Sequence, residues 1–193
     1  MFDFVKLFAL AQIINGLRMS EERVTAFHNA VKKALSALAL DPTFCAAYAD
    51  APASARFHQN YEGGLLEHCY AMGLWLYSRS VECGGTIDLT IDECARIAMY
   101  HDLCKVGLYS RGEDGAFHSD KEMYQHHALL SVRRCKELGI TLSQKEKVAI
   151  LLHMAGGWWN AEDEAALTAS DRRWLANNIG IISAVQWADM KAC

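Results

Sequence analysis

The chain has 193 residues, of which 52% are hydrophobic and 22% are charged, with only 2 prolines. This composition is typical of one globular, mostly helical domain, and it excludes a disordered or fibrous protein. The formal net charge of -4 and the sequence pI of about 6.0 exclude the basic surface with which proteins grip a long phosphate backbone.

The first 40 residues are predicted to form N-terminal helices. The apolar stretch "MFDFVKLFALAQIINGL" contains two charged residues and is shorter than the ~20 residues that span a bilayer, so it favours a packing or dimerisation helix over a targeting segment. Ser20 precedes "EERVTAFHNAVKKALSAL" and is expected to cap that helix. Residues 42–193 are predicted to form the core of the same single domain, 1–193.

Helix start signals continue through the core. Thr90 with Glu93 and Ser143 with Glu146 have the S/T-x-x-E spacing of a capping box. The runs "ARIAMYHDL" and "KVAILLHM" are apolar on nearly every side, as is typical of helices buried in the middle of a bundle. Between them, "EDG" predicts a short hairpin or lid in a polar segment. The fold class is therefore predicted to be all-α, with a hairpin insertion.

Polar residues interrupt four of the apolar segments. They are His68 after "GGLLE", the His101-Asp102 doublet after "RIAMY", His153 in "AILLHM" and Asp189 in "ISAVQWADM". Burying such side chains is costly unless they are paired or bind a metal, and helical bundles build metal sites from residues on facing helices. The alternative is a set of unrelated, hydrogen-bonded core histidines. Imidazole and carboxylate without thiolate suit divalent Mn, Fe, Co, Ni or Zn, with Mg as a further candidate.

His68, the His101-Asp102 doublet and Asp189 match in order and spacing the H…HD…D signature. On these residues the chain resembles the HD superfamily of metal-dependent phosphohydrolases, from about residue 41 to Asp189. The segment "APASARFHQNYEGGLLEH" is similar to the opening of HD domains in phage-type proteins and in the bacterial 3′-to-5′ exoribonuclease family. The resemblance implies an HD-domain helical bundle.

The resemblance also implies a ligand set. Two further histidines match those of HD proteins that hold two metals, such as cyclic-dinucleotide phosphodiesterases and diadenosine tetraphosphate hydrolases. One metal is expected on His68, His101, Asp102 and Asp189, and a second on His127 and His153, with Asp102 as the bridge. A bridging carboxylate suits metals roughly 3.5–4 Å apart, which clamp both oxygens of an in-line displacement.

Substrate contacts are expected around this centre. Asp102 is assigned a catalytic role, and Lys105, in the H-D-x-x-K form, is expected to face the phosphate and to touch only substrate. Arg56 and His58 are candidates for phosphate contact, with a surface-loop role as the alternative. Trp158 is a candidate for stacking on a base, with a core or interface role as the alternative.

These expectations predict a cytoplasmic hydrolase that uses metal-activated water on a nucleotide or short phosphodiester. The seven cysteines form no C-x-x-C pair, and their odd number favours a reducing compartment over a disulfide framework. The expected partner is a small nucleotide-like substrate, without long nucleic acid or membrane, and a homo-oligomer stays open. The alternatives are a 5′-nucleotidase-type phosphomonoesterase, a non-catalytic metal-stabilised binding module on the same fold and a metal-dependent oxygenase.

Overall fold

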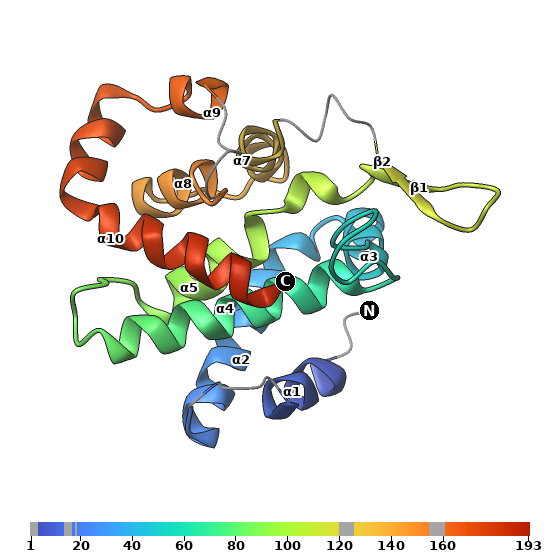
Figure 1. The fold of residues 1–193 in the computed structure, drawn as a ribbon, viewed down its shortest axis with the longest axis horizontal. Helices are drawn as coiled ribbons and strands as arrows, with labels where there is room; N and C mark the ends of the chain where they lie inside the picture. Colours follow the sequence, from blue (N-terminus) through green and yellow to red (C-terminus); the bar gives the residue numbers. More distant parts are fainter. Residues whose placement is uncertain (1–3, 14–16, 18, 120–125, 155–160) are drawn as a thin grey trace.

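The computed structural model describes residues 4–13, 17, 19–119, 126–154 and 161–193. The described chain is mostly helical and contains one two-stranded sheet, which confirms the all-α prediction (Figure 1). In chain order the elements are α1 (Phe4–Ile13), α2 (Glu21–Leu38), α3 (Pro42–Asp50), α4 (Gly64–Glu82), α5 (Ile91–Tyr100), the 3₁₀ turn η1 (Leu103–Lys105), β1 (Tyr109–Arg111), β2 (Phe117–Ser119), α7 (His127–Glu137), α8 (Gln144–Leu151), α9 (Ala161–Ala165) and α10 (Ala169–Ala192).

Helix α4 lies at the centre of the bundle. It packs against α10 and α5, and α5 in turn packs against α2 and α8. Figure 1 shows α10 running across α4, with α7 and α8 on one side of this pair and α1 and α2 on the other. Most residues of α4 and α5 are buried, as their apolar composition predicts. Buried polar side chains on these two helices therefore face other protein groups.

The predicted helix starts are confirmed. Ser20 caps α2, and both predicted capping boxes form, at the start of α5 and at the start of α8. A third box, Thr168 with Asp171, begins α10. Each box satisfies backbone N–H groups that a helix start otherwise leaves without a partner.

The predicted hairpin is also present. Strands β1 and β2 pair antiparallel, with Tyr109 opposite Ser119 and Arg111 opposite Phe117. The turn between them contains Gly115 at φ 76°, a left-handed conformation that glycine adopts without steric cost. Figure 1 shows the hairpin projecting from the helical body.

The N-terminal helix α1 packs on the core, since Leu7 and Ala11 are buried and α1 contacts α4. Among the described residues, no helix combines the length and the apolar character that a bilayer-spanning segment needs. All seven cysteines lie in the described ranges and all are free thiols.

Candidate metal centre

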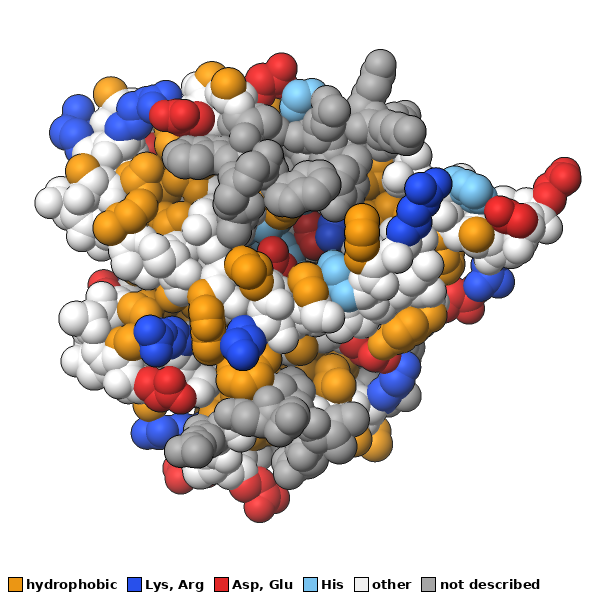
Figure 2. Space-filling view, viewed as in Figure 1, with side chains coloured by type: hydrophobic (Ala, Val, Ile, Leu, Met, Phe, Trp, Pro, Cys, Tyr) orange, Lys and Arg blue, Asp and Glu red, His pale blue; other side chains and the backbone are white. Residues whose placement is uncertain are grey.

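Six side chains from five helices or their ends meet between α4, α5, α7, α8 and α10. They are His68 on α4, His101 and Asp102 directly after α5, His127 at the start of α7, His153 after α8 and Asp189 near the end of α10. Five of them are at most 5% exposed, whereas the Asp189 side chain is 16% exposed. Figure 2 shows acidic, basic and histidine side chains together in a hollow near the middle of one face.

The first group of ligand atoms surrounds Asp189. Its Oδ1 lies 3.0 Å from His68 Nε2 and 3.6 Å from His101 Nε2. The possible ligand atoms of His68, His101 and Asp189 all lie within 4.8 Å of one another. The structure thus brings together residues that are separated by more than 120 positions in the sequence.

The second group faces the other side of Asp102. His127 Nε2 and His153 Nε2 are 3.1 Å apart, and they lie 3.9 Å and 3.8 Å from Asp102 Oδ1. Asp102 Oδ2 lies instead 3.1 Å from His101 Nε2. The two carboxylate oxygens of Asp102 therefore point toward two different sets of histidines.

The backbone fixes which ring nitrogen faces the cluster. His101 Nδ1 donates to Ala98 O at 2.8 Å, and His153 Nδ1 donates to Ile150 O at 2.7 Å. A metal-binding histidine typically donates its other ring N–H in this way. Both residues follow the last turn of a helix, where backbone carbonyls lack intrahelical partners.

This arrangement leaves two buried polar atoms, His101 Nε2 and Asp102 Oδ1, without a hydrogen-bond partner among the described residues. Because His101 Nδ1 donates to Ala98 O, Nε2 is the ring nitrogen that faces the Asp102 carboxylate. Buried polar atoms without a partner are costly. A divalent metal would bind both atoms, so the donor set fits such an ion.

The surroundings shift the pKa values of the cluster. Burial raises the pKa of Asp102, but His101 and Lys105 outweigh it and hold the pKa well below the usual range. The pKa of Asp189 is likewise lowered, because the neighbouring His101 and His68 outweigh its burial. Burial and neighbouring histidines lower the pKa of His153 to about 3. At neutral pH the two aspartates are therefore carboxylates and His153 is a neutral imidazole, which are the forms that bind metal. Burial lowers the pKa of His101, but Asp102 outweighs it and raises this pKa well above 6.5, so a metal would displace the proton of His101 Nε2.

Lys105 corrects one sequence-based expectation. It was expected to touch only substrate, but its Nζ lies 2.6 Å from Asp102 Oδ2 and the residue is 6% exposed. The reason is local, because in the 3₁₀ turn η1 side chains three residues apart lie over one another. Burial lowers the pKa of Lys105, but Asp102 and Tyr109 raise it, so the amine stays protonated.

A glycine pair sets the loop 51–60 against the start of α4. Gly63 has φ 83°, and a Cβ on Gly64 would lie 2.0 Å from Gln59 O. This close approach brings His58 onto His68, with ring centroids 4.6 Å apart. His58 is thus half-buried beside the cluster, which favours a site role over that of a plain surface-loop residue.

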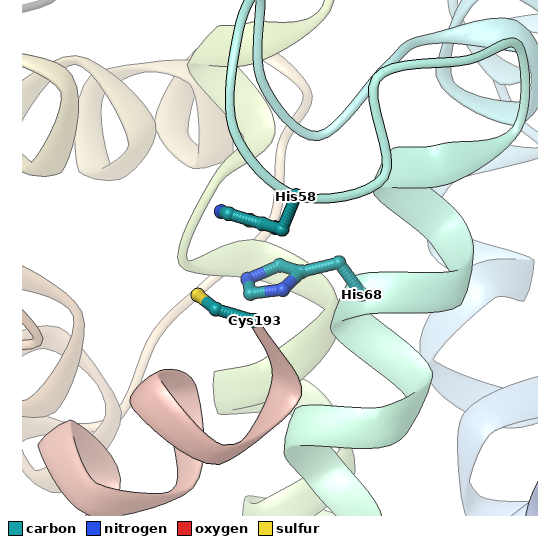
Figure 3. A group of neighbouring side chains, drawn as sticks. All are labelled: His58, His68 and Cys193. Carbon is teal, nitrogen blue, oxygen red and sulfur yellow. The ribbon is translucent and has the colours of Figure 1, made fainter.

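Cys193 also lies beside His58 and His68, and the sequence interpretation did not predict this. Figure 3 shows the His68 ring with the His58 ring and the Cys193 sulfur beside it, and the possible ligand atoms of the three lie within 4.8 Å of one another. The signal was present in the sequence, since Cys193 follows Asp189 by four residues, one turn along the same helix face.

The remaining predicted contacts have different outcomes. Arg56 is exposed and lines a cavity beside the hairpin, together with Phe57. Trp158 lies outside the described residues.

Comparison of the chain with protein-family models, with curated proteins and with solved structures gave no match. The interpretation of the cluster therefore depends on its geometry. The described residues contain three groups with the spacing of metal ligands, which are His68 with His101 and Asp189, His101 with Asp102 and His153, and His58 with His68 and Cys193.

Proposed function

We propose that the protein is a metal-dependent phosphohydrolase of the HD type, acting on a nucleotide or a short phosphodiester. The supporting observation is the division of Asp102, whose Oδ2 faces His101 and whose Oδ1 faces His127 and His153. A carboxylate shared by two sets of nitrogen ligands is what a two-metal centre needs. An unrelated group of core histidines gives no reason for this division.

Each set of residues would hold one divalent ion. His68, His101 and Asp189 would hold the first together with Asp102 Oδ2, and His127 and His153 the second together with Asp102 Oδ1. When bound, such ions neutralise charge on a phosphate group and lower the pKa of water. The presence of two sets favours a phosphodiester or pyrophosphate bond over a phosphomonoester.

The chain's own residues supply three further functions. Backbone carbonyls orient His101 and His153 through their Nδ1 atoms. Lys105 keeps Asp102 ionised and adds a fixed positive charge where negative charge develops on the phosphate. The surrounding buried side chains limit water, and this strengthens each electrostatic interaction in the centre.

Metal analysis joined to a hydrolysis screen tests this function. The purified protein is expected to contain up to two equivalents of a divalent metal and to release product from mononucleotides, linear dinucleotides or cyclic dinucleotides. Asp102→Asn is expected to lose both metal and activity. The matched control is Asp171→Asn, because Asp171 is an equally buried carboxylate that belongs to a capping box and not to the cluster. This variant should keep both its metal and its activity.

The screen has two outcomes that contradict the proposal. Metal binding without any hydrolysis across the panel would favour a metal-stabilised binding module. A protein without stoichiometric metal after growth and purification in each candidate metal would reject the metal centre itself.

A further inference from the structure

A cavity of about 320 Å³ lies between the loop 51–60 and the hairpin. Its lining residues are Ser54, Ala55, Arg56, Phe57, Tyr109, Phe117, His118 and Ser119. Small-molecule pockets have volumes of this order and combine apolar walls with a few polar groups. Three aromatic rings and one guanidinium give this cavity that character.

The loop side of the cavity has a fixed backbone. Ser54 Oγ accepts from the Phe57 N–H at 2.8 Å and donates to His58 O at 2.9 Å. The Gln59 side chain donates to Ala192 O at 2.9 Å, which ties the loop to α10. Phe57 is nevertheless 77% exposed. The loop thus holds a large aromatic side chain toward solvent in a preorganised position, which lowers the entropic cost of binding a ligand.

The cavity adjoins the metal centre at two points. His58, the residue after Phe57, has its ring against that of His68. On the other wall, Tyr109 interacts electrostatically with Lys105, which contacts Asp102. On both walls, a residue that lines the cavity is thus next to, or interacts with, a residue that contacts the cluster. Figure 2 shows apolar, basic and histidine side chains between the central hollow and the projecting hairpin.

We propose that this cavity is the subsite for the nucleobase of the substrate, with Phe57 as the stacking surface and Arg56 as the cation at its edge. The inference depends on the proposed function for the position of the phosphate, which lies at the metal centre while the base lies in the cavity. Aromatic side chains bind every base through its π-face, and an Arg guanidinium adds charge toward the anionic ester.

Two probes that differ only in the base test the subsite. They are the 5′-phosphonate analogues of AMP and of ribose 5-phosphate, in which a methylene group replaces the ester oxygen so that hydrolysis does not consume them. Calorimetric titration of the full-length protein is expected to show about 10- to 100-fold tighter binding of the adenosine probe, as stacking of one base provides.

Phe57→Ala should remove this preference and leave the affinity for the ribose probe unchanged. Because Phe57 is exposed, its replacement does not open the core, and circular dichroism should be unaltered. Leu40→Ala is the matched control, since Leu40 is 84% exposed and lies outside the cavity, and it should keep the full preference.

The outcomes separate this inference from the proposed function. Equal affinity for both probes, or a preference that survives Phe57→Ala, overturns the subsite even if the protein hydrolyses nucleotides. A Phe57-dependent preference in a protein that hydrolyses nothing supports the subsite and rejects the phosphohydrolase. Failure to bind either probe overturns the subsite.

Discussion

Two polar clusters, one partly and one almost fully buried, include residues in or directly after helix α5, and they differ in how completely their hydrogen bonds are made. Near the middle of the helix, Arg96 donates to Glu146 Oε1 at 2.5 Å, to Glu146 Oε2 at 3.2 Å and to Thr141 O at 2.6 Å. The Ser143 N–H donates to Glu146 Oε2 at 2.7 Å. Five residues after Arg96, the candidate metal cluster begins at His101, where His101 Nε2 and Asp102 Oδ1 are buried without a hydrogen-bond partner among the described residues.

This difference distinguishes polar residues that hold helices together from polar residues that could bind a ligand. A network in which both carboxylate oxygens of Glu146 accept hydrogen bonds holds α5 to α8 and leaves no carboxylate oxygen free for a ligand. A cluster with buried, unpartnered polar atoms is costly in itself, and such a cost is usual where a site is built for a ligand. Completeness of hydrogen bonding, more than burial, distinguishes the two.

The largest expected effect is at Asp102. Asp102→Asn keeps the shape of the side chain but removes the charge that both histidine sets face, so metal content should fall to zero. Hydrolysis should decrease by at least a factor on the order of 10³. Inductively coupled plasma mass spectrometry and product release measure the two effects. A variant that keeps two metals and its activity would place the chemistry elsewhere.

Removing one histidine set tests whether the centre has two parts. His127→Ala combined with His153→Ala should remove one metal equivalent and leave the other, because the first set keeps all its ligands. The helical circular dichroism spectrum should persist. If metal content is unchanged, only one ion binds, and the assignment of His127 and His153 as ligands is wrong.

Replacing Lys105 should affect both the rate of hydrolysis and the stability of the fold. Lys105→Met removes the positive charge and leaves Asp102 without its ion-pair partner, so kcat/KM should decrease by a factor on the order of 10²–10³. Unlike a residue that touches only substrate, Lys105 should also affect the Tm. In the absence of added metal the Tm should decrease by several degrees, about 2–4 °C for each kcal/mol lost. An unchanged Tm would mean that the ion pair with Asp102 is not formed in solution.

The hydrogen-bonded network of Arg96 and Glu146 should affect stability but not metal binding. Glu146→Gln breaks a pair in which the Arg96 side chain is 28% exposed, so the loss should stay below the roughly 3–5 kcal/mol of a fully buried pair. Thermal denaturation should show a decreased Tm, whereas metal content and kcat should match the wild type. Loss of metal in this variant would mean that the two clusters on α5 are not independent.

The smallest effect concerns pH at the start of α10. Burial raises the pKa of Asp171, but the hydrogen bond from Lys147 and those from Thr168 lower it well below the usual value of 3.8. A lowered folded-state pKa stabilises the protein above the unfolded value, and this contribution is lost as pH falls below about 4.

Asp171→Asn should therefore lower the Tm at pH 7 by about 2–4 °C, as expected for a loss of about 1 kcal/mol. At pH 3 the difference between variant and wild type should shrink. A difference that stays constant between pH 7 and pH 3 would exclude the charge of Asp171 as its source.

Much of the secondary structure could be predicted from short stretches of sequence. Ser20, the two capping boxes and the "EDG" turn are each determined by side chains within a few residues, and each forms as predicted. Cys193 and Phe57 escaped this reading because their significance depends on segments distant in sequence. Lys105 was misjudged for another reason, since the change from α-helix to 3₁₀ turn after Tyr100 redirects its side chain.

The sequence by itself determined the helices, their starts and the polar residues that interrupt apolar runs, because these follow from short-range hydrogen bonding and hydrophobic periodicity. Only the tertiary structure decided that Asp102 presents one oxygen to each histidine set, and that Phe57 and the hairpin line one cavity. Such arrangements depend on how α4, α5, α8 and α10 pack and on the close approach of Gln59 to Gly64. Packing of helices distant in the chain fixes atoms to within an ångström, and no local pattern carries that information.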